Sequence, residues 1–130
     1  MRMKNGKKEW GIDYSPPLSN LTFDDIYNNQ IEFQKIVTKK EHLPEDDINW
    51  YSYHIQALIE ELGELMKADK RWKVLRNNKY DRNEKIEEFA DVLITILNIA
   101  IFSGFSLDDI IKAIYIKIHQ NFERLNLNDK

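Results

Sequence analysis

Apolar residues recur at helical spacing along four segments of the chain, and polar stretches separate these segments. The spacing predicts four helices, at about 23–39, 47–72, 83–102 and 106–125. Thr22 with Asp25, and Ser106 with Asp109, have the spacing of capping boxes at the starts of the first and last helices. Gly104 is placed to end the third helix. Since no segment alternates like a strand, the sequence predicts an all-α fold, a compact four-helix bundle.

Residues 1–20 differ from the rest of the chain. They hold two of the three prolines and two of the four glycines, and they lack a periodic apolar pattern. We expect an extended, partly disordered N-terminal arm at 1–20, followed by one domain at 21–130. A chain of 130 residues has room for one hydrophobic core and little more.

Composition narrows the chemistry that this domain can perform. The net charge of −3 argues against a broadly basic binder of nucleic acid polymers. Cysteine is absent, which excludes thiolate metal sites and cysteine nucleophiles. The three histidines, His42, His54 and His119, are far apart in the sequence. A metal site would therefore rely on carboxylates, which favour hard ions such as Mg²⁺ or Mn²⁺.

The sequence suggests neither export nor membrane insertion. The basic N-terminus has no apolar stretch behind it, unlike a secretory signal. The longest uncharged run, Val92 to Leu107, is shorter than the roughly 20 apolar residues of a membrane span. We therefore expect a buried core helix there and a cytoplasmic protein without a membrane partner.

Carboxylates interrupt the apolar stripe of the second predicted helix. On a helical wheel Glu61 falls in the middle of that stripe, Glu64 lies at its margin, and Glu60 points further out. An unpaired buried charge costs on the order of several kcal/mol, at least as much as an unsatisfied buried polar group. Glu61 is therefore expected to have a partner.

The third predicted helix shows the same anomaly more strongly. Beyond Asp91 it is apolar nearly all round, which is typical of a helix buried on most sides. Five polar residues nevertheless share about a quarter of its wheel: Glu84, Glu88, Asp91, Thr95 and Asn98. Such a stripe forms either a hydrogen-bond network or the wall of a polar cavity.

Two helices thus each present an acidic pair at i, i+3, Glu61 with Glu64 and Glu88 with Asp91. Side by side they would gather four carboxylates, whose repulsion a divalent cation would remove. The alternative is that the pairs lie on solvated faces and form ion pairs with lysines such as Lys67. A di-iron bundle would require Glu-x-x-His on two helices, and neither pair has a histidine at that spacing.

Basic residues follow in two other places. Lys117, Asn121 and Arg124 share one face of the last helix, where they would hold phosphate oxygens or form an ordinary solvated C-terminal turn. The segment 67–85 has eight basic and three acidic residues, a net of +5. It is either a phosphate clamp or a solvated connection.

Three motifs resemble those of the all-α nucleoside triphosphate pyrophosphohydrolases, which include MazG-like proteins, dimeric dUTPases and dCTP pyrophosphatases. The first two read Glu-Glu-Leu-Gly-Glu at 60–64 and Glu-Glu-Phe-Ala-Asp at 87–91. The third is Lys117-x-x-x-Asn121-x-x-Arg124. Together they cover about residues 50–125 and occur in the family's order.

The resemblance implies a Mg²⁺-dependent conversion of a (d)NTP to the monophosphate and pyrophosphate by attack of an activated water at the α-phosphate. The implied metal ligands are Glu61, Glu64, Glu88 and Asp91. Glu60 would be an outer-shell base, and Lys117 and Arg124 would neutralise the leaving group. Asn121 would contact the phosphates or the sugar. Family members are homodimers or tetramers, with sites near the subunit interface.

The resemblance also implies that aromatic and amide side chains select the base. The candidates are Trp50, Tyr53, Trp72, Tyr80, Asn98 and Phe102. The segment 71–73 resembles that of dimeric dUTPases, whereas the tail after Arg124 lacks their Gly-Tyr-Lys. A pyrimidine substrate such as dUTP or dCTP and a different base preference both stay open. The alternative to an enzyme is a non-catalytic helical module that binds a nucleotide or a protein.

Overall fold

The computed structural model describes residues 20–40, 48–73 and 80–128, for Ile48 and 126–128 the backbone alone. It contains α1 (Phe23–Lys40), α2 (Ile48–Ala68), the short 3₁₀ helix η2 (Lys70–Trp72), α3 (Arg82–Phe102) and α4 (Leu107–Asn128). The predicted all-α fold with four helices is confirmed. The predicted arm lies outside the described residues except for Asn20.

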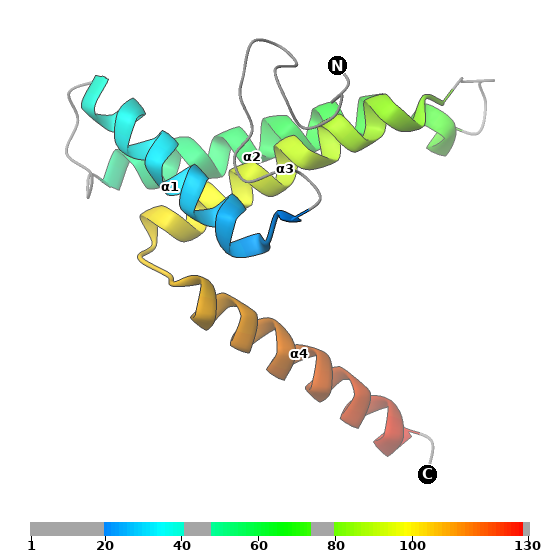
Figure 1. Cartoon of the computed structure of the whole chain (residues 1–130). Helices are drawn as coiled ribbons and strands as arrows, with labels where there is room; N and C mark the ends of the chain where they lie inside the picture. The colour runs from blue at the N-terminus through cyan, green and yellow to red at the C-terminus, as the bar shows by residue number, and fades with distance from the viewer. Residues whose placement is uncertain (1–19, 41–47, 74–79, 129–130) are drawn as a thin grey trace.

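The helices α2 and α3 lie side by side, and α1 packs on α3 (Figure 1). The predicted capping box at Thr22 forms completely, and the one at Ser106 forms in one of its two hydrogen bonds. The Thr22 backbone N–H donates to Asp25 Oδ2 at 3.0 Å, and the Asp25 N–H donates to Thr22 Oγ1 at 3.2 Å. The Asp109 N–H likewise donates to Ser106 Oγ at 3.1 Å. These caps fix where α1 and α4 begin.

The end of α3 is a glycine turn, as the sequence predicts. Gly104 has a φ of +77°, in the left-handed region that glycine adopts without strain. The Phe105 N–H donates to the Ala100 carbonyl at 3.0 Å, and the Gly104 N–H donates to the Ile101 carbonyl at 3.1 Å. This turn sends the chain away from the axis of α3 and sets the direction of α4.

A small apolar core holds α1, α3 and the first turn of α4 together. It consists of the buried side chains Tyr27, Leu97, Ala100 and Leu107. The Tyr27 hydroxyl donates to the Phe105 carbonyl at 2.7 Å, so the phenol bridges α1 and the α3–α4 turn. Burial also raises the pKa of Tyr27.

The sequence predicts one apolar side for α1, formed by Ile26, Phe33, Ile36 and Val37, but α1 packs on α3 mainly by another side. Three members of the predicted side are exposed, at 42%, 55% and 66%: Ile26, Phe33 and Ile36. The buried positions of α1 are instead Tyr27, Gln34 and Thr38. The physical reason is a pair of hydrogen bonds. Gln30 and Gln34 donate to Asn98 of α3, which holds their side of α1 against α3.

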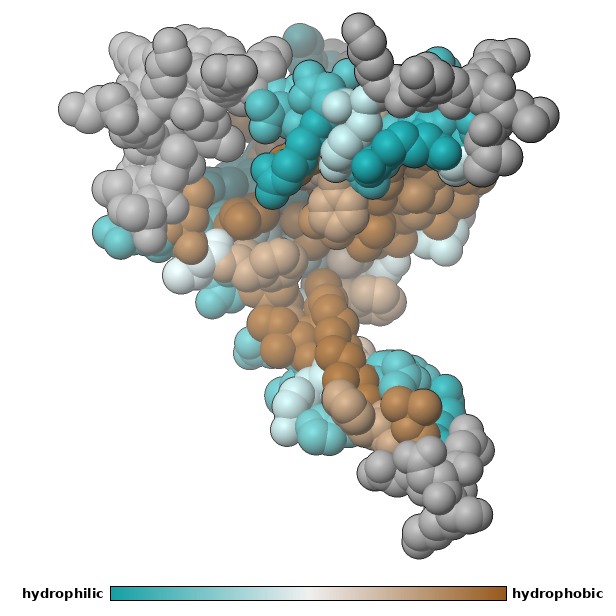
Figure 2. All heavy atoms as spheres, turned by 90° about the vertical axis from the view of Figure 1, so that its right-hand side faces the viewer, coloured by the Kyte–Doolittle hydropathy of each residue, from teal (hydrophilic) through white to brown (hydrophobic). Residues whose placement is uncertain are grey.

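The expectation that α3 is buried on most sides is wrong for the single chain. Its apolar residues exposed by 40–52% are Ile86, Phe89, Leu93, Ile94 and Ile96. Among the described residues, those of α3 that are buried are Val92, Thr95, Leu97, Asn98 and Ala100. Figure 2 shows hydrophobic side chains gathered below the hydrophilic edge of this part of the molecule.

The helix α4 projects away from the other three (Figure 1). Every described side chain from Ile111 to Leu125 is exposed, although many are apolar (Figure 2). Within the described residues, no single helix is long and apolar enough to cross a membrane. Only α3 and α4 together meet that length and composition, as a pair bent by 114°.

Candidate active site

Three carboxylates meet where α2 lies against α3. Glu61 comes from α2, and Glu88 and Asp91 come from successive turns of α3. One carboxylate oxygen of each lies within 4.8 Å of the others. Glu61 and Glu88 are half-buried, whereas Asp91 is exposed. Such a group of oxygen ligands suits a hard divalent cation.

The surroundings of Glu61 and Glu88 disfavour the ionised forms of their carboxyl groups. Burial raises the pKa of Glu61, and the nearby charges of Asp91 and Glu88 raise it further. The pKa of Glu88 is raised by burial and then by Asp91 and Glu64. No described basic side chain forms a hydrogen bond or ion pair with Glu61, Glu88 or Asp91. A bound cation would relieve this repulsion.

Two other acids predicted for the site lie at its edge. Glu64 is half-buried and forms an ion pair with Lys67 at 3.5 Å, the solvated pairing that the sequence left open. Its charge nevertheless raises the pKa of both Glu61 and Glu88, which places it near the cluster. Glu60 is exposed. Their roles as a metal ligand and an outer-shell base stay predictions.

The basic residues predicted for the phosphates are not beside the acids within one chain. Lys117, Asn121 and Arg124 are exposed on α4, which leads away from α2 and α3 (Figure 1). Arg124 Nη1 donates to Asn121 Oδ1 at 3.3 Å, so these two side chains at least share a face. Their role at the phosphates stays a prediction.

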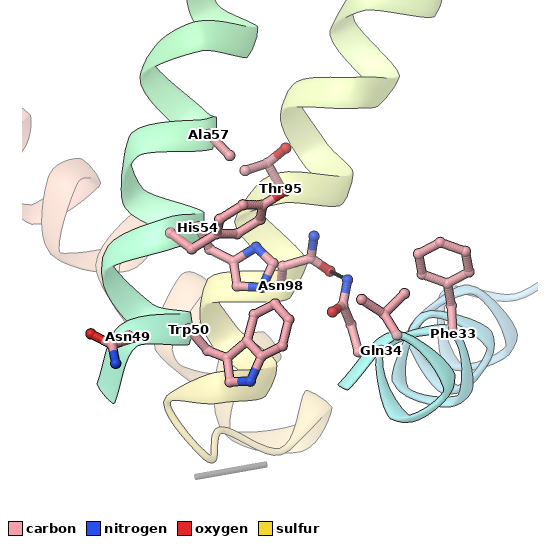
Figure 3. Close-up of a pocket in the computed structure, with 10 residues that line it drawn as sticks. Phe33, Gln34, Asn49, Trp50, His54, Ala57, Thr95 and Asn98 are labelled. Atoms are coloured by element: carbon pink, nitrogen blue, oxygen red, sulfur yellow. Dashed lines mark hydrogen bonds between the residues drawn. The ribbon is translucent and has the colours of Figure 1, made fainter. Parts of the chain in front are cut away.

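A cavity of about 680 Å³ opens between α1, α2 and α3 (Figure 3). Thr95 and Asn98 line it, so the polar stripe predicted on α3 forms a cavity wall. Asn98 also accepts hydrogen bonds from Gln30 and Gln34. Both interpretations of that stripe, a network and a cavity wall, therefore hold for its buried half.

Four of the six candidates for base binding gather at this cavity. The ring of Trp50 stacks near Phe102 at 5.6 Å between centroids, and Tyr53 meets Trp50 edge-on at 5.8 Å. His54 stacks on Phe102 at 4.9 Å and on Trp50 at 5.9 Å. Trp50, Tyr53 and Asn98 line the cavity directly. These residues provide aromatic surface beside an amide.

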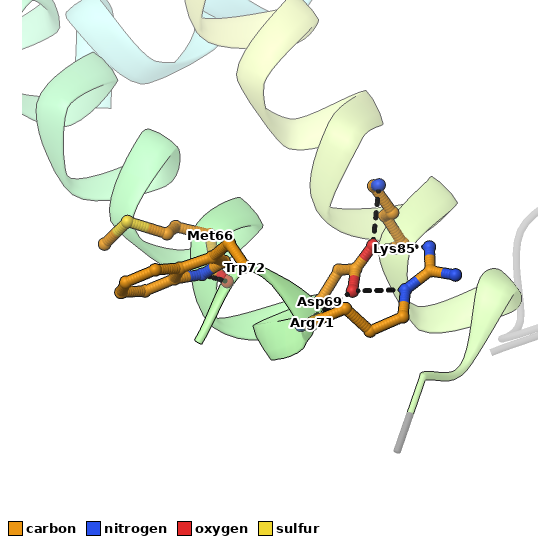
Figure 4. Close-up of polar contacts among 5 residues, drawn as sticks. All are labelled: Met66, Asp69, Arg71, Trp72 and Lys85. Atoms are coloured by element: carbon orange, nitrogen blue, oxygen red, sulfur yellow. Dashed lines mark hydrogen bonds and ion pairs between the residues drawn. The ribbon is translucent and has the colours of Figure 1, made fainter. Parts of the chain in front are cut away.

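The other two candidates, Trp72 and Tyr80, belong to a different cluster. Figure 4 shows the Trp72 ring turned toward Met66, whose carbonyl accepts a hydrogen bond from Trp72 Nε1 at 3.3 Å. The Arg71 guanidinium lies 3.7 Å from the centre of the Tyr80 ring. Within one chain, neither aromatic lines the cavity between α1 and α3.

Asp69 ties this second cluster together (Figure 4). It accepts hydrogen bonds from Arg71 Nη2 at 2.8 Å and from Lys85 Nζ at 2.9 Å. The Arg71 hydrogen bond holds the pKa of Asp69 well below its usual range, and Lys85 contributes as well. Two cations of the basic segment 67–85 therefore bind an internal carboxylate. Residues 74–79 of that segment lie outside the described residues.

Gln34 and His54 are among the cavity residues that sequence reasoning did not predict for the site. A signal for His54 was present, because it shares one helical stripe with Trp50, Ala57 and Glu61 at steps of four, three and four residues. Gln34 had no comparable signal. Gln34 lies on the side of α1 that packs on α3, and the apolar pattern did not indicate that side.

Comparison with known protein families accounts for this arrangement. Residues 51–124 match the model of the MazG nucleotide pyrophosphohydrolase domain. The chain belongs to this family. The match contains the three clustered carboxylates and the basic residues of α4, and Trp50 directly precedes it. A search of curated proteins found no match to the chain.

Proposed function

We propose that this MazG-family chain hydrolyses a nucleoside triphosphate to the monophosphate and pyrophosphate with the help of Mg²⁺, or alternatively Mn²⁺. The family membership gives the general activity, nucleotide pyrophosphohydrolysis. The observation that carries the proposal is the meeting of Glu61, Glu88 and Asp91 within 4.8 Å inside the matched domain.

The residues fit a hard divalent ion. All donors are carboxylate oxygens, and the raised pKa values of Glu61 and Glu88 reflect charges that gain from a cation. Glu61, Glu88 and Asp91 would hold the ion, with Glu64 as a fourth ligand once it leaves Lys67. When bound, Mg²⁺ supplies positive charge that activates water and offsets the charge of the phosphates.

The chain's own residues would then divide the remaining work. Glu60, exposed beside Glu61, would accept a proton from the attacking water. The bond between the α-phosphorus and the bridging oxygen breaks, and the pyrophosphate leaves with that oxygen. Lys117 and Arg124 would stabilise the charge that develops on the leaving group, and Asn121 would contact the phosphates or the sugar.

This division requires a homo-oligomer, a homodimer or tetramer. Support comes from α4, whose exposed apolar residues have no cover in one chain and whose cations lie away from the acids. We propose that α4 of one copy packs on the exposed apolar side of α2 and α3 of another. Obligate interfaces of this kind are rich in apolar side chains. Trp72 would approach the substrate only within such an assembly.

A pyrimidine deoxynucleoside triphosphate, such as dUTP or dCTP, is the substrate class that we propose. We place the reaction in the cytoplasm, without a nucleic acid polymer or a membrane as partner. Tyr53 and Asn98 are the proposed contacts to the nucleoside, supported by their position at the cavity.

The decisive experiment is a panel of all common NTPs and dNTPs, assayed with Mg²⁺ for monophosphate and pyrophosphate. In ¹⁸O-labelled water, attack at the α-phosphorus places the label in the monophosphate. We expect labelled monophosphate from at least one dNTP. Label in the pyrophosphate, or release of inorganic phosphate instead, would contradict the proposed reaction.

A further inference from the structure

An ion pair joins the end of α2 to the start of α3 (Figure 4). Asp69, the residue directly after α2, accepts a hydrogen bond from Lys85 Nζ at 2.9 Å, and Lys85 is the fourth residue of α3. The Asp69 side chain is only 12% exposed, and that of Lys85 is 39% exposed. Because the pair is largely shielded from water, it is screened less than an ion pair on the open surface.

The carboxylate of Asp69 is held in one orientation. Arg71 Nε and Nη2 each donate to it at 2.8 Å, one to each oxygen, and the Arg71 backbone N–H donates to Oδ1 at 3.2 Å. A forked pair of this kind fixes direction as well as distance. The Arg71 guanidinium also lies against the Tyr80 ring, and Asp69 and Tyr80 form an antiparallel bridge. Asp69 therefore presents Oδ2 to Lys85 as a rigid acceptor.

The position of this ion pair along the two helices relates it to the carboxylates of the candidate site. Glu61 is eight residues before Asp69, and Glu88 and Asp91 are three and six residues after Lys85. These intervals correspond to about 12 Å along α2 and about 4.5 and 9 Å along α3. Sliding of one helix past the other would therefore change the separation of Glu61 from Glu88 and Asp91.

The contacts beyond the acids, at the other end of α2 and α3, resist sliding less. There Trp50 and His54 stack on Phe102 at 5.6 and 4.9 Å between ring centroids. Stacked rings attract each other over a range of offsets, whereas a hydrogen-bonded ion pair requires its donor and acceptor at a defined distance.

The acids tolerate little sliding. Their oxygens meet within 4.8 Å. A slip by one helical turn, about 5.4 Å, would exceed that separation. Mg²⁺ requires a near-ideal octahedral arrangement of its ligands, so smaller displacements also weaken its binding.

We propose that Asp69 and Lys85 are positioning residues that set the register of α2 against α3. In this register Glu61 lies at the separation from Glu88 and Asp91 at which the three carboxylates bind a divalent cation. The inference rests on the proposed function for the identity of the ion. Neither Asp69 nor Lys85 contacts the ion, and both act through the helices that carry its ligands.

The first test is calorimetric titration with Mg²⁺, without nucleotide and below the melting temperature of every variant. Lys85→Met keeps the length of the side chain and removes its charge. We expect Mg²⁺ affinity to fall about tenfold, as when supporting contacts around metal ligands are lost. Electrostatics alone predicts the opposite, because the acids would be left with one cation fewer nearby. Lys85→Arg should restore most of the affinity, since a guanidinium can donate to the same oxygen.

Lys67→Met is the matched control. It removes the same charge near the same end of α2, but Lys67 pairs with Glu64 on its own helix. Its Mg²⁺ affinity should equal or exceed that of wild type. Asp69→Asn combined with Lys85→Met should bind Mg²⁺ about as weakly as the weaker of the two single variants, because both changes remove one contact. Independent effects of the two charges would cancel instead.

The second test measures the register without any metal. The chain has no cysteine, so nitroxide labels can be attached through Gln56→Cys and Glu87→Cys, at exposed positions of α2 and α3. Pulsed electron paramagnetic resonance then gives the distance between the labels, with the labelled protein diluted in unlabelled protein. We expect Lys85→Met to shift or broaden the distance distribution and Lys67→Met to leave it unchanged.

An unchanged distance distribution in Lys85→Met would overturn the inference. So would a Mg²⁺ affinity of Lys85→Met equal to or above that of wild type, since the register would then not matter for the ligands. The proposed function fails separately. If the wild-type protein binds no Mg²⁺ while the distance still depends on Lys85, the role in register stands and the metal-dependent reaction does not.

Discussion

The paired helices α2 and α3 and the projecting helix α4 carry similar sequence signals but differ in packing within the single chain. All three are long, apolar on much of their surface and marked by a polar stripe. On α2 and α3 the stripes face each other and bring three carboxylates together. On α4 the stripe of Lys117, Asn121 and Arg124 faces no described neighbour.

The difference shows what a polar stripe needs before it becomes a site. The carboxylates of α2 and α3 perturb each other's pKa because packing sets their separation. The cations of α4 have the complementary charge but no fixed distance to the acids within the chain. If a second copy covers α4, the two halves form one site.

The largest effect is expected from breaking the acidic half. Asp91→Asn and Glu61→Gln should each lower kcat/KM more than about a hundredfold, because a metal ligand is lost. The ligand-free variants should melt at or above the wild-type temperature, since repulsion is relieved, and Mg²⁺ should no longer raise it. The exposed neighbour Glu87, changed to Gln, is the control. Near-normal activity of Asp91→Asn would remove it from the ligand set.

The second effect tests whether the two halves come from different copies. Glu61→Gln and Arg124→Ala should each be nearly inactive alone. When the two are unfolded, mixed in equal amounts and refolded, random pairing into dimers gives about a quarter of wild-type activity, because half of the dimers are mixed and carry one intact site. Continued inactivity of the mixture would indicate that both halves act within one copy.

A smaller but direct effect is expected on assembly. Ile118→Glu places a charge among the exposed apolar residues of α4 and should shift light-scattering mass from oligomer to monomer at micromolar concentration. Lys112→Glu, at an exposed polar position of the same helix, controls for the added charge. An unchanged oligomer in both variants would place the interface elsewhere.

The smallest effect is the pH dependence of the metal-free protein. The pKa values of Glu61 and Glu88 are raised in the folded state, so folding takes up protons just above pH 4.5, the ordinary carboxyl value. Stability should therefore fall as pH rises through the raised pKa values. Melting curves of Glu61→Gln should flatten that slope.

The dependence of stability on pH that we expect from Asp69 has the opposite sign. Its pKa is lowered by Arg71, so its contribution is present above the ordinary carboxyl range and is lost as pH falls toward the lowered value. Asp69→Asn should therefore reduce stability at neutral pH and weaken the loss on acidification. If both variants keep the wild-type dependence of stability on pH, neither carboxyl has the assigned environment.

Much of the fold could be predicted from the sequence because its signals are local. Thr22 and Asp25 cap α1 through bonds between residues three apart, and Gly104 ends α3 through its own φ. The position of Glu61 on an apolar stripe likewise follows from helical periodicity alone. These features depend on residues within one or two turns of each other.

The remainder required the tertiary arrangement. Ile26, Phe33 and Ile36 are exposed although they form the apolar side of α1, because Gln30 and Gln34 form hydrogen bonds with Asn98 from 68 and 64 residues away. No periodicity reveals such a pairing. Trp50 and Trp72 were equal candidates for base binding until packing placed one at the cavity and the other beside Met66.

The sequence by itself determined the helices, their caps and the stripes on which the carboxylates lie, since each depends on short-range geometry and side-chain chemistry. Only the tertiary structure decided which stripes face each other. It joined Glu61 to Glu88 and Asp91, turned the amides of α1 toward α3 and left α4 uncovered. Such contacts between distant segments depend on how whole helices pack, and that is a property of the assembled chain.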